Sequence, residues 1–138
     1  MRVTLPEGYR PSETEPFMNP MMQEYFRQKL LRWKEELLNE SNQTLQSLQE
    51  ESLAQPDLAD RASAETDRSI ELRTRDRFRK LIAKIESAMK RIDDGSYGYC
   101  EETDEPIPLK RLEARPTATL SVEAQERHER LERTKRDE

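Results

Sequence analysis

The sequence predicts an all-α protein built as a long antiparallel coiled-coil hairpin with a small globular end. Charged residues make up 38% of the 138 residues and apolar residues 33%, a balance that is typical of long, solvated helices. No glycine interrupts positions 20 to 94. Two segments within that range repeat apolar residues at spacings of three, four and seven, as amphipathic helices do.

The first 19 residues form a separate segment with little periodicity. Pro6, Pro11 and Pro16 are spread through it. Proline-containing polar segments of this kind lack enough apolar surface to fold alone. We therefore expect residues 1–19 to be a flexible or loosely docked N-terminal arm.

The first long helix is predicted to begin at Asn19-Pro20, an N-cap followed by proline at the first helical position. Its apolar stripe consists of Phe26, Leu30, Leu31, Leu37, Leu38, Leu45 and Leu48. Pro56 cannot continue a helix, so the pattern stops there.

The second long helix has caps available at Asp57 and Asp60 and ends at "DDGSYG", where Gly95 suits a helix C-cap. Its stripe consists of Phe78, Leu81, Ile82, Ile85, Ala88, Met89 and Ile92. Residues 20–94 then form the hairpin, with its tip near residues 53–63. Each helix of roughly 30 residues is about 45 Å long, and the apolar stripe thins toward the tip.

Residues 95–138 are expected to form the globular end. Pro106, Pro108 and Pro116 interrupt this segment, and a charged helix is predicted from about Ser121. A segment of this length buries little core by itself. It must therefore pack on the base of the hairpin or on the last helix.

Charge and hydropathy narrow the function classes. The formal net charge is -5, although residues 71–91 carry eight basic side chains against three acidic ones. DNA-binding domains are usually more basic overall, so this local basic face suits an acidic partner surface or a small phosphorylated ligand. A solvated helix face is the alternative. No apolar run is long enough to span a membrane and no apolar signal core is seen, so we expect a cytoplasmic protein without membrane contact.

The stretch from Tyr97 begins like a zinc-binding knuckle, with Gly98 followed by Cys100. Thr103 stands where a second cysteine would complete C-x-x-C, and Ser121 and Ala124 stand where a second pair would close the site. One thiolate, two hydroxyls and a methyl group do not supply the four N or S ligands of a structural zinc site. We therefore predict a degenerate zinc-finger region that holds no metal.

A mixed site is the alternative, with His128 joined by Glu101, Glu102 or Asp104, but its spacing matches no known pattern. We interpret His128 as an ordinary surface or partly packed residue. The single cysteine excludes an intrachain disulfide, and we interpret Cys100 as a small buried apolar side chain rather than a redox sensor.

Other interactions must replace the metal. Ser121 can N-cap the last helix, with Glu123 in its first turn, and Thr103 can form local turn hydrogen bonds. We also expect a small apolar cluster made of Tyr99, Ile107, Leu109, Leu112, Leu120 and Ala124.

An enzyme is not expected. Cys100 and His128 have no activating third group, and the chain has no glycine-rich phosphate loop. A structural or dimerising coiled-coil protein would explain the two helices equally well.

Four segments, in order, carry a family resemblance: "DLADRA", "ELRTRDRFRKLIAKIE", "YGYC" and "RLEARPTA". Over roughly residues 20–136 the chain resembles the DksA/TraR family of transcription regulators. The resemblance implies a monomer that binds RNA polymerase directly, without DNA contact, and inserts its hairpin through the secondary channel. It also implies action together with the alarmone guanosine tetraphosphate (ppGpp) in the stringent response.

The resemblance assigns roles to individual residues. Asp57, Asp60 and Ala62 match the tip that reaches the polymerase active centre, although both aspartates also suit helix capping. Arg77 matches a basic residue that docks on the polymerase rim, and a solvated helix residue is the alternative.

Lys84 and Arg115 match residues that contact ppGpp at the polymerase interface, and Arg111 is a plausible neighbour. Ammonium and guanidinium groups suit phosphate oxygens. Where the family has a further lysine, this chain has Gln125, which predicts a weaker or differently built ppGpp response.

Overall fold

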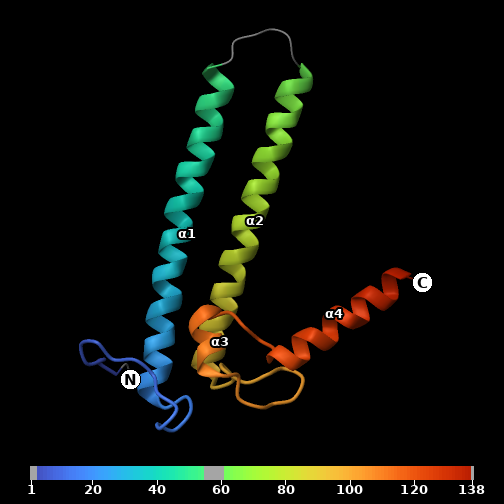
Figure 1. Cartoon of the computed structure of the whole chain (residues 1–138). Coiled ribbons are helices and arrows are strands. Elements are labelled where there is room, and N and C mark those ends of the chain that lie inside the picture. The colour runs from blue at the N-terminus through green and yellow to red at the C-terminus, as the bar shows by residue number, and fades with distance from the viewer. Residues whose placement is uncertain (1–2, 55–60, 138) are drawn as a thin grey trace. The chain divides into compact units, whose positions relative to one another are not determined.

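A computed structural model describes residues 3–54 and 61–137 of the chain, with side chains described for 3–51 and 64–135. Four helices follow in order: α1 (Pro20–Ala54), α2 (Arg61–Asp94), α3 (Leu109–Ala114) and α4 (Val122–Asp137) (Figure 1). The structure is 69% helix without strands in the described residues, which confirms the predicted all-α class. Over the same residues, no helix has the length and apolar character needed to cross a membrane.

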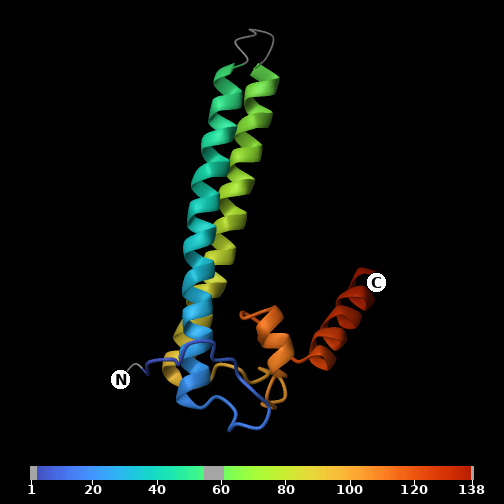
Figure 2. The ribbon, with the colours of Figure 1, turned by 60° about the vertical axis from the view of Figure 1, so that its left-hand side comes forward.

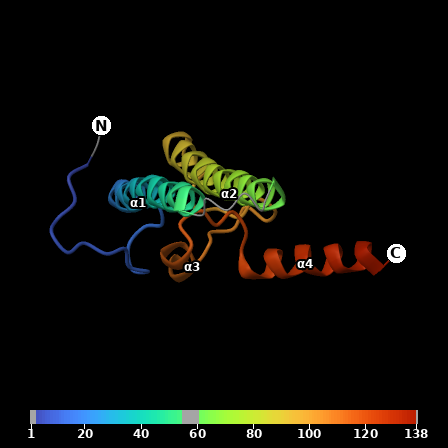
Figure 3. The ribbon, with the colours of Figure 1, turned by 90° about the horizontal axis from the view of Figure 1, so that it is seen from above.

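α1 and α2 lie side by side as a hairpin in the views of Figure 1, Figure 2 and Figure 3. The predicted caps are confirmed at both described ends. Asn19 accepts the backbone N–H of Met22 at its side-chain oxygen, 3.0 Å away, which fixes the start of α1. Gly95 has a φ of 85° just after α2, and Ser96 N–H donates to the Arg91 carbonyl at 2.9 Å. A left-handed residue here ends the helix and satisfies its last carbonyls.

The apolar stripe of α1 is narrower than the sequence predicts. Phe26, Leu30 and Leu37 are buried, whereas Leu31 and Leu38 are 39% and 43% exposed. The predicted apolar stripe is therefore wider than the surface that α1 buries. A two-helix hairpin has a single seam, so each helix buries only the a and d positions and leaves the flanking positions in water.

The chain divides into two compact units that are described separately. The globular unit comprises Met1–Leu30 and Ser87–Glu138, and the hairpin unit comprises Leu31–Glu86. The buried apolar residues of the globular unit include Met18, Met22, Phe26, Leu30, Ala88, Ile92, Tyr97, Cys100, Ile107, Leu112 and Ala124. Among its described side chains, the hairpin unit buries only Leu37, Phe78 and Ile85, so its seam is thin.

The N-terminal arm makes specific contacts within the globular unit. The ring of Phe17 packs edge-on against Tyr99 at 5.3 Å, and Met18 is buried. The ring of Tyr9 packs edge-on against Tyr25 of α1, with 6.1 Å between centroids. The arm thus contributes aromatic and apolar surface to the core of this unit.

Candidate functional site

The segment from Gly98 to Ile107 folds into a tight knuckle closed by its own backbone. Cys100 N–H donates to the Glu105 carbonyl at 2.8 Å, and Ile107 N–H donates to the Gly98 carbonyl at 2.7 Å. Asp104 N–H donates to the Cys100 carbonyl at 2.9 Å, and Tyr99 pairs with Pro106 as an isolated β-bridge. The knuckle therefore keeps a defined turn through backbone hydrogen bonds.

The four positions expected for zinc cysteines are occupied by groups with other roles. Cys100 is 1% exposed, and its sulfur accepts the backbone N–H of Ser121 at 3.4 Å. The Ser121 hydroxyl accepts the Ala124 N–H at 3.2 Å, which confirms the predicted N-cap of α4. The Thr103 hydroxyl accepts the Glu105 N–H at 3.4 Å, a local turn bond as predicted. Ala124 is fully buried.

The sulfur of Cys100 is not in purely apolar surroundings. Burial by itself would raise its pKa. Hydrogen bonds from the Thr103 hydroxyl and from the backbone N–H groups of Ser121, Thr103 and Glu102 more than offset burial and lower the pKa of Cys100 to about 6. Cys100 is buried as predicted, and its sulfur accepts a backbone hydrogen bond in addition to its apolar contacts.

The donor set does not fit a tetrahedral zinc ion. A structural site needs four N or S ligands, and these positions offer one sulfur. The hydroxyls of Thr103 and Ser121 already accept backbone hydrogen bonds. No group of three His, Cys, Asp or Glu residues that could hold a metal ion is found among the described residues. The alternative ligand His128 is 46% exposed and contacts Glu102, so it ties α4 to the knuckle as an ordinary surface pair.

The predicted apolar cluster is present in part. Ile107, Leu112 and Ala124 are fully buried, whereas Leu109, Leu120 and Tyr99 are half-buried. Tyr97 was not among the residues predicted for this cluster. It is 2% exposed and larger than any of the three buried members. Its hydroxyl donates to the Pro116 carbonyl at 2.7 Å. The Tyr97 ring can be buried because its hydroxyl has this hydrogen-bond partner. The partner is distant in sequence, so no local pattern predicts the burial.

A polar clamp joins α3 to α1 within the globular unit. Lys29 Nζ donates to both the backbone carbonyl and the carboxylate of Glu113, each at 2.8 Å. The Tyr25 hydroxyl donates to the same carboxylate at 3.0 Å. Although burial raises the pKa of Glu113, the hydrogen bonds from Lys29 and Tyr25 lower it overall. The clamp residues are separated by more than 80 positions, so sequence patterns did not reveal it.

Two of the predicted ppGpp residues lie in the globular unit, at and just after α3. Arg115 is exposed, and its N–H donates to the Arg111 carbonyl at 2.7 Å. Arg111 is half-buried, and its Nε donates to the Leu120 carbonyl at 2.8 Å, so part of this guanidinium is used by the fold. Gln125 is half-buried on α4 and contacts Glu129 at 3.5 Å.

The hairpin unit carries Arg77 and Lys84, both exposed on α2. They are seven residues apart, two helical turns, so they share one face of the helix. The Arg77 guanidinium lies over the Phe78 ring at 5.3 Å, whereas Asp76 pairs with Arg79 and Lys80 at 2.6 and 2.9 Å. No ion pair of Arg77 or Lys84 is found within the described part of the chain. Their charges are therefore available to an anionic partner.

The predicted tip lies largely outside the described residues. Asp57 and Asp60 fall in the segment 55–60, which the structure does not describe. Ala62 belongs to the first turn of α2, although its side chain is not among those described. The roles of these three residues stay predictions.

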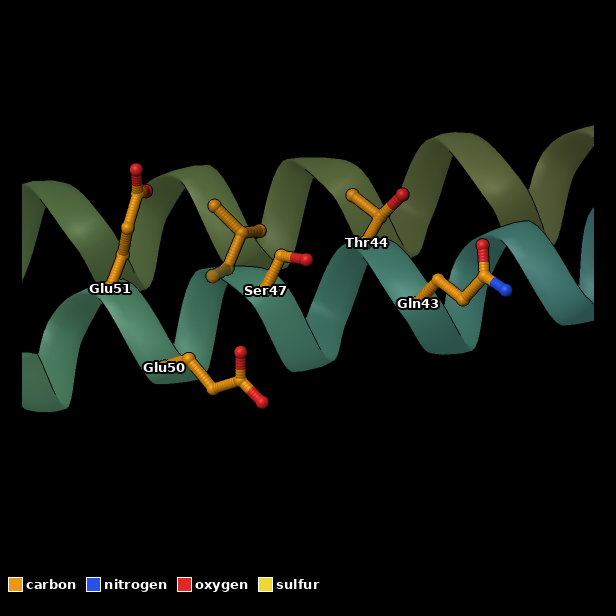
Figure 4. Close-up of a pocket in the computed structure, with 6 residues that line it drawn as sticks. Gln43, Thr44, Ser47, Glu50 and Glu51 are labelled. Atoms are coloured by element: carbon orange, nitrogen blue, oxygen red, sulfur yellow. The ribbon is translucent and has the colours of Figure 1, made fainter.

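A shallow groove runs along one side of α1 in the hairpin unit. Figure 4 shows its labelled lining residues, Gln43, Thr44, Ser47, Glu50 and Glu51, all on this helix, and Leu48 completes the lining. The groove carries two carboxylates and no cation. It therefore does not suit a phosphorylated ligand.

Comparison with known sequences gives two family matches. Residues 22–92 match the N-terminal domain of DnaK suppressor protein DksA. Residues 95–130 match the prokaryotic dksA/traR C4-type zinc finger. The second match covers the knuckle even though three of its four cysteine positions hold Thr103, Ser121 and Ala124.

Individual relatives agree with these matches. The chain is 70% identical to the RNA polymerase-binding transcription factor DksA of Caulobacter vibrioides, over 94% of this chain and 92% of that protein. It is 43% identical to the Escherichia coli K12 protein of the same name, over 85% of this chain and 78% of that protein. Among solved structures, transcription factor DksA2 from Pseudomonas aeruginosa is similar, with a TM-score of 0.74 and 45% identity. That alignment covers 85% of this chain and 90% of the other.

Proposed function

Because this chain belongs to the DksA/TraR family, we propose that it binds RNA polymerase directly and regulates the initiation of transcription. The observation that carries the proposal is the 70% identity, over 94% of the chain, to a protein named RNA polymerase-binding transcription factor. The Caulobacter vibrioides and Escherichia coli relatives are named as transcription factors and not as enzymes. A polymerase partner would place the protein in the cytoplasm.

The hairpin is proposed to enter the secondary channel of the polymerase. α1 and α2 contain 35 and 34 residues, so each is about 50 Å long. A thin two-helix rod of that length suits a narrow channel, and the scarcity of buried apolar residues in the hairpin unit indicates that reach, not core packing, determines its length. Asp57, Asp60 and Ala62 would then act at the tip, near the catalytic centre.

The cationic residues are proposed to mediate docking and the ppGpp response. Arg77, exposed and without an ion pair among the described residues, would contact the rim of the channel. Lys84, Arg111 and Arg115 would contact phosphate oxygens of ppGpp at the polymerase interface. Because Arg111 already donates its Nε to Leu120, it would offer only its terminal nitrogens.

The function is proposed not to require zinc. The knuckle is closed by backbone hydrogen bonds and by the Cys100, Thr103 and Ser121 side chains. A metal requirement would need ligands that these positions do not have.

Asp60→Asn tests the proposal. The change removes one negative charge and keeps the size and capping ability of the side chain. We expect the variant to bind polymerase like the wild type but to lose its effect on a stable-RNA promoter in transcription with purified components. Asp67→Asn, an exposed position on α2, is the matched control and should behave as wild type.

Direct binding is measured with RNA polymerase, and a second protein that occupies the secondary channel is used as competitor. Loss of binding in its presence supports the channel assignment. Failure of the wild type to bind polymerase would refute the proposed function. Full regulation by Asp60→Asn at saturating protein would refute the tip assignment alone.

A dimerising coiled coil is the second candidate, favoured by the exposure of Leu31 and Leu38 seven residues apart on α1. Two exposed leucines at heptad spacing could pack against a helix of a second chain. Sedimentation equilibrium decides between the two, because the polymerase-binding proposal expects a monomer at micromolar concentration.

A further inference from the structure

Arg115 is an exposed cation on a backbone that is fixed from both directions. Its own N–H donates to the Arg111 carbonyl at 2.7 Å, and its carbonyl accepts the Ala118 N–H at 3.0 Å. No counter-ion of its guanidinium is found among the described residues. A fixed backbone with a free cationic side chain is the arrangement that preorganised binding requires.

The Pro116 side of Arg115 is held by Tyr97. The buried Tyr97 hydroxyl donates to the Pro116 carbonyl at 2.7 Å, and Pro116 itself is buried. Tyr97 lies directly beyond the C-terminal end of α2, so this bond ties the residue after Arg115 to that end of the helix.

The Glu113 side is held by Lys29 of α1. One ammonium group bonds the carbonyl and the carboxylate of the same residue, each at 2.8 Å. The bond to the carbonyl holds the backbone, and the bond to the carboxylate neutralises its charge. Glu113 lies two residues before Arg115, and a carboxylate left free there would compete with phosphate oxygens for the guanidinium.

From these contacts we propose that Tyr97 and Lys29 are positioning residues for Arg115 in the ppGpp response. Tyr97 fixes the backbone after Arg115, and Lys29 fixes the backbone before it and keeps the Glu113 carboxylate occupied. The inference rests on the proposed function, because it requires that Arg115 contacts ppGpp in the polymerase complex.

The test uses full-length protein with RNA polymerase in purified transcription. Two half-maximal concentrations are measured: that of ppGpp at saturating protein, and that of the protein without ppGpp. Tyr97→Phe removes only the hydroxyl, and loss of one buried hydrogen bond should raise the half-maximal ppGpp concentration about fivefold. Lys29→Met removes a charge-assisted pair and should raise it about tenfold.

The controls are matched by chemistry. Tyr99→Phe removes a phenol hydroxyl from a half-buried ring in the same unit, and Lys135→Met removes an exposed ammonium group from α4. Both should leave the two concentrations unchanged. A purely structural defect would raise the half-maximal protein concentration, because it lowers the amount of folded protein, and would leave the ppGpp value at saturating protein unchanged, whereas a positioning role raises the ppGpp value selectively.

Amide hydrogen exchange supplies a second readout that does not depend on transcription. Tyr97→Phe should speed exchange at the N–H groups of Arg115 and Ala118, which both close the turn around Arg115. Unchanged exchange there would overturn the mechanical part of the proposal.

Arg115→Ala distinguishes a failure of the positioning roles from a failure of the proposed ppGpp contact of Arg115. If Arg115→Ala weakens the ppGpp response and Tyr97→Phe and Lys29→Met do not, the positioning roles are refuted and the proposed function remains. If Arg115→Ala leaves the response intact, the ppGpp assignment of Arg115 fails and this inference fails with it. If the positioning variants and Arg115→Ala all weaken it selectively, the inference is supported.

Discussion

The backbone N–H of Ser121 donates to the sulfur of Cys100 at 3.4 Å, across 21 positions of sequence. The bond joins the knuckle to the start of α4 at the place where a metal would join two ligand pairs. Glu101 N–H reinforces it by donating to the Thr119 carbonyl at 2.9 Å. Hydrogen bonds therefore perform the cross-linking that zinc performs in a C4 finger, and the stability of this region should follow the chemistry of Cys100 rather than the supply of metal.

Purified protein is expected to contain no stoichiometric zinc, and a chelator should leave its melting temperature unchanged. Structural zinc can contribute about 10 kcal/mol or more to folding of small zinc-nucleated peptides, so a bound metal would produce a large shift. Metal analysis and thermal melting with and without chelator measure this. The triple variant Thr103→Cys, Ser121→Cys, Ala124→Cys is the positive control and should bind one zinc. One zinc per wild-type chain would overturn the prediction that the knuckle holds no metal.

Stability should depend on pH through Cys100. Its pKa is lowered to about 6 in the folded state from an ordinary value of 9.0. A lowered pKa means that the folded state binds the proton less tightly, so the contribution is complete above pH 9 and is lost as the pH falls through 6. The free energy of unfolding of the wild type, minus that of Cys100→Ala, should therefore increase from pH 6 to 9. Urea titrations at several pH values measure it, and a difference that is flat or falls with pH would refute a folded-state thiolate.

Gly98→Ala should be more destabilising than Gly8→Ala. Both glycines have positive φ, 92° and 76°, so alanine at either position incurs the left-handed penalty of roughly 1–2 kcal/mol. At Gly98 the new Cβ would also lie 3.0 Å from Met18 Cε and 3.2 Å from Phe17 Cζ, whereas nothing lies within 4 Å at Gly8. Overpacking adds about 1–3 kcal/mol, so urea unfolding should show the larger loss for Gly98→Ala. Equal losses would mean that the arm does not pack on the knuckle in solution.

Gln125→Lys should strengthen the ppGpp response. The resemblance predicts a lysine at the position of Gln125, and a charge-assisted bond to phosphate there would lower the half-maximal ppGpp concentration by up to about tenfold. Gln46→Lys is the matched control, because Gln46 contacts Glu50 four residues on, as Gln125 contacts Glu129. Transcription with purified polymerase over a ppGpp titration measures both. An equal effect of the two substitutions would indicate a nonspecific gain of positive charge.

Much of the fold and part of the site were predictable because their causes are local in sequence. The apolar spacing and the caps at Asn19, Gly95 and Ser121 determine where helices begin and end, and each cap makes its bonds within a few residues. The lack of a zinc ligand set is likewise a property of the residues at four positions. These conclusions needed no knowledge of which segments meet in space.

Tertiary structure alone decided which of these residues are buried and paired. It buried Leu37 and left Leu38 exposed, because a two-helix seam has room for one stripe. It paired Lys29 with Glu113 across 84 positions and Tyr97 with Pro116 across 19, and it gave the Cys100 sulfur a hydrogen bond from the Ser121 N–H across 21. Burial and partner geometry at such separations depend on how distant elements pack, and no pattern of neighbouring residues contains that information.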